Sequence, residues 1–106
     1  IVNELDIVDI SNLSAPSLKK TYSLNNPYGL SKDGNKLFVC DGKNGLKIYD
    51  ATNLYDLKLV NDFTGMETYD VIAFNGKAVM VAKDGLYQYD YSGASVKLLS
   101  KMSTSN

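Results

Sequence analysis

The chain has 106 residues, a formal net charge of −1, eleven lysines and no arginine or histidine. This near-neutral balance predicts no nucleic-acid surface, and the lack of histidine excludes a Ser-His-Asp triad within these residues. No apolar run approaches the roughly 18 residues that a transmembrane helix needs.

Three nearly identical heptapeptides divide the chain. LDIVDIS begins at Leu5, LKIYDAT at Leu46 and LYQYDYS at Leu86, so the copies are 41 and 40 residues apart. A fixed period of this size is typical of stacked structural units that cannot bury their apolar faces singly. The chain is therefore interpreted as a repeat array.

The first segment, residues 1–23, is predicted to hold two strands, Leu5–Ile10 and Leu18–Ser23. The second segment, residues 24–64, is predicted to hold four, because short apolar or alternating runs follow one another between Gly-containing turns. These four cover Tyr28–Ser31, Lys36–Cys40, Leu46–Asp50 and Leu57–Phe63. The SKDGNK stretch is expected to make a turn one residue longer than its counterpart in the next repeat.

The third segment, residues 65–103, repeats the pattern and leaves 104–106 as a tail. Its predicted strands are Tyr69–Phe74, Lys77–Ala82, Leu86–Tyr91 and Val96–Met102. The Asn-Gly pair in FNGK favours a tight type I′ hairpin turn. Tyr87, Tyr89 and Tyr91 share one strand face. We expect them to pack between repeats, although a platform for stacking sugars is the alternative.

Four strands in about 40 residues are the pattern of a β-propeller blade, and complete rings use about four to eight blades. Paired-helix repeats of similar length need a helical periodicity that is absent here. The expected fold class is all-β, with propeller blades of four antiparallel strands in one incomplete ring over residues 1–106. The expected partners are the remaining blades of a longer protein or further copies of the chain.

Two stretches resemble the LVIVD-repeat propellers. LDIVDISNLSAPSL is similar to the signature strand, Asp turn and Pro-led outer strand of that family, and YDVIAFNGKAVMVAKDG to its inner strand, Gly turn and second strand. The third copy departs from the pattern, with Gln88 in place of an aliphatic residue and no Pro. The resemblance implies a bacterial propeller exported to the periplasm or cell surface. It implies no activity.

An aspartate ends the third strand of each repeat, and Ser or Thr follows two residues later. These residues are Asp9, Asp50 and Asp90. Three aligned carboxylates could be interpreted as a metal ring. The Asp-x-Ser/Thr spacing instead favours Asx-turns, in which the carboxylate accepts a backbone N–H two residues on. We predict structural turns here.

No catalytic residue, metal site or cofactor is predicted. Cys40, the single cysteine, has no histidine to activate it and lies in an apolar run, which favours a small buried side chain. DGKNG and KDGNK lack the oxygen-bearing residues of a calcium loop. These stretches are interpreted as turns.

Loops that differ between repeats are the better candidates for function, because architecture needs the same residue in each unit and a ligand does not. The antiparallel strand order brings the connections between repeats and between the second and third strands to one rim. The candidate ligand-binding residues there are Asn25, Asn26, Lys43, Met66 and Glu67.

The predicted function is a binding or scaffold module for an extracellular protein or glycan. The alternative is part of a propeller hydrolase whose catalytic residues lie mostly in other blades. Asp70 is the one carboxylate placed on a predicted inner strand, and its counterpart in the preceding repeat is Gly29. This mismatch favours the binding module.

Overall fold

The computed structural model describes residues 4–9, 17–23 and 28–103, and the side chains of residues 28–103. Its ordered elements are strands, apart from one short 3₁₀ turn, η1 (Gly42–Asn44). The expected all-β class is therefore confirmed. No helix in the described ranges has the length and apolar character to cross a membrane.

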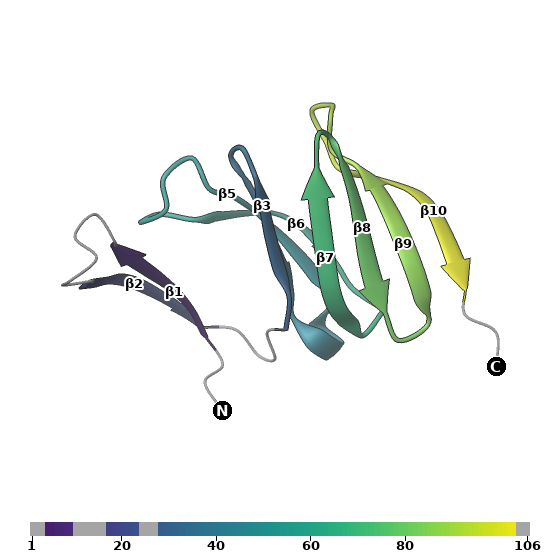
Figure 1. Ribbon diagram of the computed structural model, residues 1–106, viewed down its shortest axis with the longest axis horizontal. Helices are drawn as coiled ribbons and strands as arrows, with labels where there is room; N and C mark the ends of the chain where they lie inside the picture. The colour runs from purple at the N-terminus through teal and green to yellow at the C-terminus, as the bar shows by residue number, and fades with distance from the viewer. Residues whose placement is uncertain (1–3, 10–16, 24–27, 104–106) are drawn as a thin grey trace.

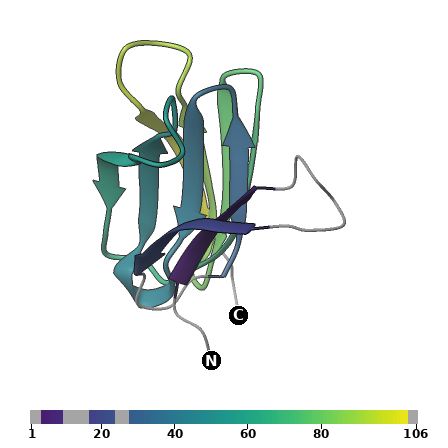
Figure 2. The same cartoon turned by 90° about the vertical axis from the view of Figure 1, so that its left-hand side faces the viewer.

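The strands form one hairpin and two sheets, all antiparallel (Figure 1). The hairpin pairs β1 (Glu4–Asp9) with β2 (Ser17–Ser23). The first sheet has the order β3 (Leu30–Asp33), β4 (Lys36–Cys40), β5 (Leu46–Asp50), β6 (Lys58–Phe63). The second sheet has β7 (Thr68–Phe74), β8 (Lys77–Ala82), β9 (Gly85–Asp90), β10 (Lys97–Ser103) in the same order. Figure 2 shows the hairpin in front of the two sheets.

Chain order is also spatial order in both sheets, so each is a meander of the kind found in propeller blades. β6 and β10 form the outer edges. β3 lies beside β7, its counterpart in the next sheet. The first strands of the two sheets therefore run next to each other. One face of the first sheet packs against one face of the second.

One bulge recurs at the same place in every repeat. It interrupts the pairing at Ile7/Val8 in β1, at Ile48/Tyr49 in β5 and opposite Gln88/Tyr89 in β9. A bulge sets two residues of one strand against one of its partner and increases the local twist. The repeat therefore preserves the bend of the outer strand as well as the apolar pattern.

The main core lies between the two sheets. The first sheet contributes Phe38, Cys40, Leu46 and Ile48, each with no exposed surface. The second sheet contributes apolar residues of β7 and β8 and, beside them, three tyrosines, namely Val71, Ala73, Ala78, Met80, Ala82, Tyr87, Tyr89 and Tyr91. The tyrosines pack between repeats as predicted, and a sugar platform is excluded because the three rings are buried.

Polar contacts fix the register of the sheets. The backbone N–H of Ala73 donates to Ser31 Oγ at 2.9 Å, and that of Asn75 donates to Asp33 Oδ2 at 3.0 Å. β7 is an edge strand, so these N–H groups would otherwise lack acceptors within the sheet. Ser31 and Asp33 of β3 thus replace a neighbouring strand for β7.

Several strand bounds differ from expectation by one residue, and two details differ more clearly. β3 begins two residues later than predicted, although Tyr28 N–H still donates to the Cys40 carbonyl at 2.8 Å. The longer turn predicted for SKDGNK is wrong, because Asp33 pairs with Lys36 and leaves two loop residues. The FNGK turn has positive φ at both central residues, Asn75 (52°) and Gly76 (88°), as a type I′ turn requires.

Two buried tyrosines of the core differ in their hydroxyl partners. Tyr91 OH donates to Asp33 Oδ2, and burial together with that bond raises the Tyr91 pKa to about 12. Tyr89 OH is buried with no hydrogen-bond partner in the described part of the chain. A buried hydroxyl without a partner is destabilising compared with an apolar group of the same shape.

We therefore expect opposite effects from removing these hydroxyls. Tyr89→Phe should leave the free energy of unfolding unchanged or raise it by about 1 kcal/mol, whereas Tyr91→Phe should lower it by about 1.5–3 kcal/mol. Urea unfolding of the two variants beside the wild type measures both. Equal destabilisation by both changes would contradict the assignment of partners.

Candidate functional site

The candidate site lies on the rim that carries η1, the β6–β7 connection and the β8–β9 turn, at the lower edge in Figure 1. The opposite rim carries the β3–β4 and β7–β8 turns and the β9–β10 loop. This division follows from the antiparallel order, since consecutive turns of a meander alternate between its two ends. Connections from both sheets thus meet at one end.

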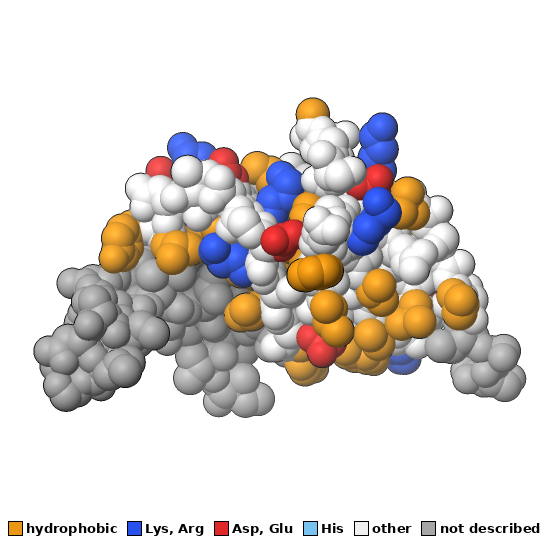
Figure 3. Space-filling model, turned by 45° about the horizontal axis from the view of Figure 1, so that its top comes forward, with side chains coloured by type: hydrophobic (Ala, Val, Ile, Leu, Met, Phe, Trp, Pro, Cys, Tyr) orange, Lys and Arg blue, Asp and Glu red, His pale blue; other side chains and the backbone are white. Residues whose placement is uncertain are grey.

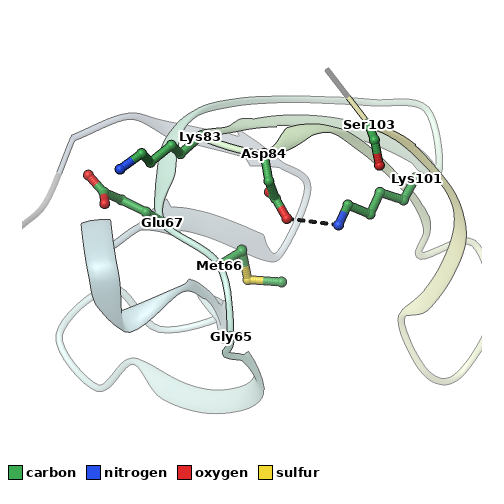
Figure 4. A pocket seen from close by; sticks show the side chains of 7 residues that line it. All are labelled: Gly65, Met66, Glu67, Lys83, Asp84, Lys101 and Ser103. Carbon is green, nitrogen blue, oxygen red and sulfur yellow. Dashed lines mark ion pairs between the residues drawn. The ribbon is translucent and has the colours of Figure 1, made fainter. Parts of the chain in front are cut away.

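A hollow of about 510 Å³ opens on this rim (Figure 4). We call it the rim pocket, and its lining residues are Gly65, Met66, Glu67, Lys83, Asp84, Lys101 and Ser103. The first three come from the β6–β7 connection, the next two from the β8–β9 turn and the last two from β10. Its size lies within the range of about 300–1,000 Å³ that is usual for small-molecule sites.

One wall of the rim pocket is an ion pair. Lys101 Nζ lies 2.8 Å from Asp84 Oδ2, and Tyr87 OH donates to the same carboxylate at 2.9 Å. The hydrogen bond from Lys101, followed by that from Tyr87, holds the Asp84 pKa below its usual range. The Lys101 ammonium also lies 5.3 Å from the centre of the Tyr87 ring. The three side chains therefore hold one another in place.

The other wall carries Glu67 and Lys83. The backbone N–H of Lys83 donates to the Glu67 carbonyl at 2.9 Å, which ties the two connections together. Tyr69 OH lies 3.5 Å from Glu67 Oε2. In Figure 4, the Met66 side chain lies below Asp84, and the charged ends of Glu67 and Lys83 point away from Asp84 and Lys101. The rim pocket thus combines one apolar group with an ion pair and two further charged side chains.

A buried hydrogen bond fixes the β6–β7 connection that lines the pocket. Thr68, which has no exposed surface, donates through Oγ1 to the Gly45 carbonyl at 2.9 Å. This bond joins the start of β7 to the turn that contains η1. The β6–β7 connection is therefore held at its end, and Met66 packs against the core.

The structure brings together some of the predicted site residues. Met66 and Glu67 line the rim pocket. Lys43 is exposed on η1, on the same rim, but is not among the lining residues. Asn25 and Asn26 lie outside the described residues.

The sequence interpretation missed Lys83, Asp84, Lys101 and Ser103. The loop that contains Lys83 was assigned to this rim by strand order, so its charge was an available signal. Lys101 and Ser103 were not predictable in the same way. They lie on an outer strand, and their position depends on the bulge opposite Gln88/Tyr89.

The aspartates at the strand ends make turn hydrogen bonds. Asp50 Oδ1 accepts Thr52 N–H at 2.9 Å and Thr52 Oγ1–H at 2.6 Å. Asp90 Oδ1 accepts the same two groups of Ser92 at 2.8 and 2.6 Å. The hydroxyl bonds, followed by the backbone bonds, lower the pKa of both carboxyls. The side chain of Asp9 lies outside the described part.

Asp70 faces the preceding sheet at close range. A Cβ atom on Gly29 would lie 2.3 Å from Asp70 Oδ1, so glycine makes room for this carboxylate. Asp70 Oδ1 also accepts the Val71 N–H at 2.9 Å. The difference between Gly29 and Asp70 therefore has a packing reason. Among the described residues, no group of three Cys, Asp or Glu side chains could hold a metal ion.

Cys40 is a buried side chain, as predicted. It has no exposed surface and lies between the sheets. Burial raises the pKa of its thiol to about 12, so the reactive thiolate is suppressed at neutral pH.

The family comparison identifies a repeat. A family model described as the LVIVD repeat matches residues 1–23 and 29–64. No curated protein matches the chain. No solved structure matches it either.

Proposed function

The chain belongs to the LVIVD-repeat family, and on that premise we propose that it is a binding module of an exported bacterial propeller that holds an extended segment of an extracellular protein in the rim pocket. The observation that carries the proposal is the lining of the pocket. The lining combines the apolar Met66, the Asp84–Lys101 ion pair and two further charged side chains of opposite sign, Glu67 and Lys83. A peptide offers matching charges of both signs and apolar side chains.

A protein segment suits this lining better than a glycan does. Sugars are held chiefly by the open faces of aromatic rings. Tyr87, the ring beside the Asp84–Lys101 ion pair, is only 6% exposed and has Lys101 above it. The charged side chains at the pocket wall instead favour a partner with complementary charges, because such charges increase the specificity and the rate of association.

The chemistry of the pocket favours binding over catalysis. Asp84 has its carboxylate occupied by Lys101 and Tyr87, and the lowered pKa keeps it ionised at neutral pH. A carboxylate in this state does not donate a proton as a general acid. The group acts here as a fixed negative charge.

Selection of peptides from a random display library, with the purified chain as bait, tests the proposal. We expect selected peptides to bind the wild type in calorimetry and to bind at least about tenfold more weakly to Glu67→Lys and to Lys83→Glu. Ser95→Lys, an exposed residue of the opposite rim, is the matched control and should bind as the wild type does. Failure to enrich any peptide, or equal affinity in all four proteins, would contradict the proposal.

Export is the second part of the proposal and rests on the family resemblance. We expect an antibody raised against the chain to detect the protein in the cell-envelope or culture fraction of its source organism, and protease added to intact cells or spheroplasts to remove it. Detection in the cytoplasmic fraction alone would contradict export and would leave the peptide test unaffected.

A further inference from the structure

A second hollow, of about 360 Å³, opens on the rim opposite the rim pocket. We call it the junction pocket, because both sheets line it. The β9–β10 loop of the second sheet forms one wall, and the first sheet contributes Asn35, Lys36, Asp50, Thr52, Val60 and Asn61. Figure 3, in which this rim is turned forward, shows acidic and basic side chains close together on it. The junction pocket therefore lies where two neighbouring repeats meet.

Two opposite charges of the junction pocket are not joined to each other. Lys36 on β4 and Asp50 on β5 stand directly opposite in the strand pairing, and both are partly exposed. Asp50 Oδ1 accepts the two hydrogen bonds from Thr52, which lower the pKa of the carboxyl and keep it ionised at neutral pH. Lys36 Nζ forms no ion pair with any carboxylate in the described part of the chain. The Lys36 ammonium and Asp50 Oδ2 therefore remain available to a ligand.

The second sheet has the same two residues in a closed arrangement. Lys77 and Asp90 stand opposite each other as the counterparts of Lys36 and Asp50, and Lys77 Nζ lies 3.6 Å from Asp90 Oδ2. Asp90 also makes the same two turn hydrogen bonds, with Ser92. The turn is therefore repeated, whereas the lysine–aspartate ion pair is not. Architecture needs one arrangement in every repeat, while a ligand needs it in a single place.

The remaining lining narrows the class of ligand. Asn35 and Asn61 bring amide groups, which both donate and accept hydrogen bonds, and Val60 brings an exposed apolar surface. None of the described residues that line the pocket is aromatic, which disfavours a sugar. An inorganic anion would be repelled by Asp50, and a metal cation by Lys36. A small molecule with one charge of each sign satisfies both residues.

We propose that the junction pocket binds a free α-amino acid, whose carboxylate pairs with Lys36 and whose ammonium pairs with Asp50 Oδ2. Both charged groups of this ligand are attached to one carbon atom. They can therefore reach two side chains on neighbouring strands, whose Cβ atoms are about 4.5–5.5 Å apart. The amides and Val60 are left to contact the side chain of the ligand. The proposal is independent of the rim pocket, which lies at the other end of the strands.

Calorimetric titration of the full chain with each of the standard amino acids tests the proposal. We expect at least one of them to bind with a dissociation constant in the millimolar range or tighter. The same amino acid with an acetylated amine, or with an amidated carboxylate, should bind at least about tenfold more weakly, because each derivative lacks one of the two charges. This comparison uses the wild-type protein alone and does not depend on how any variant folds.

Lys36→Met and Asp50→Asn locate the site. Each change removes one charge and nearly preserves the size of the side chain, and an asparagine at position 50 can still accept the Thr52 N–H. We expect each variant to bind the amino acid at least about tenfold more weakly than the wild type. Lys77→Met and Asp90→Asn make the same changes at the counterpart positions and are the matched controls, with affinity equal to that of the wild type.

Three results would overturn the proposal. The first is that no standard amino acid binds at millimolar concentration. The second is that the acetylated and amidated derivatives bind as well as the parent amino acid. The third is that the changes at Lys36 and Asp50 weaken binding no more than those at Lys77 and Asp90. Peptide binding at the rim pocket is measured with Glu67→Lys and Lys83→Glu, so these results are distinguishable from failure of the proposed function.

Discussion

Gly45→Val is expected to lower the free energy of unfolding by about 3 kcal/mol or more, since it combines backbone strain with a steric clash. Gly45 has φ of 86° and ψ of −155°, a region that only glycine populates readily. A Cβ atom there would lie 1.9 Å from the Phe63 carbonyl oxygen, which belongs to the paired strand β6. Relief requires β5 and β6 to separate.

The control for this change is Gly34→Asn. Gly34 also has positive φ, 57°, but a Cβ atom there meets nothing within 4 Å. Its counterpart in the next repeat is Asn75, with φ of 52°. We expect a change within about 0.5 kcal/mol, as at most surface positions. Guanidinium unfolding of both variants checks the pair, and a Gly45→Val protein as stable as Gly34→Asn would contradict the close contact with Phe63.

Phe38→Ala is expected to lower the free energy of unfolding by about 3–5 kcal/mol, the usual cost of truncating a buried aromatic side chain. Phe38 lies on β4 with no exposed surface, and its ring centre is 5.0 Å from that of Tyr91 in the other sheet. The truncation therefore leaves a cavity at the contact between the sheets. Neither sheet can close it without moving the other.

Leu59→Ala is the comparison for Phe38→Ala. Leu59 lies on the outer strand β6 and is 50% exposed, so it loses less contact, and we expect a cost below about 1 kcal/mol. The same denaturant titration measures both proteins. Equal losses for Phe38→Ala and Leu59→Ala would contradict the burial of Phe38 between the two sheets.

Local pattern was sufficient to predict much of the fold. The boundaries of β4, β5 and β8 agree with those expected from alternation and Gly-bounded apolar runs, because side chains on a strand alternate whatever lies beyond it. The type I′ turn at Asn75 and Gly76 follows from two residues that tolerate positive φ. The turn bonds of Asp50 and Asp90 reach only two residues along the chain. All of these depend on neighbours in sequence.

Contacts between repeats needed the tertiary structure. β3 begins later than its residues suggest, because its position is set by Ser31 and Asp33 against the N–H groups of β7, more than 40 residues away. Lys101 reaches Asp84 only because β10 crosses a bulge beside β9. In the sequence, Ile72 and Phe74 are apolar strand residues like Phe38. Only the stacking of the sheets shows that Ile72 and Phe74 are exposed while Phe38 is buried. The repeat in the sequence determines what each blade is made of, whereas its neighbours decide which face is covered, since burial depends on the surface that another sheet presents.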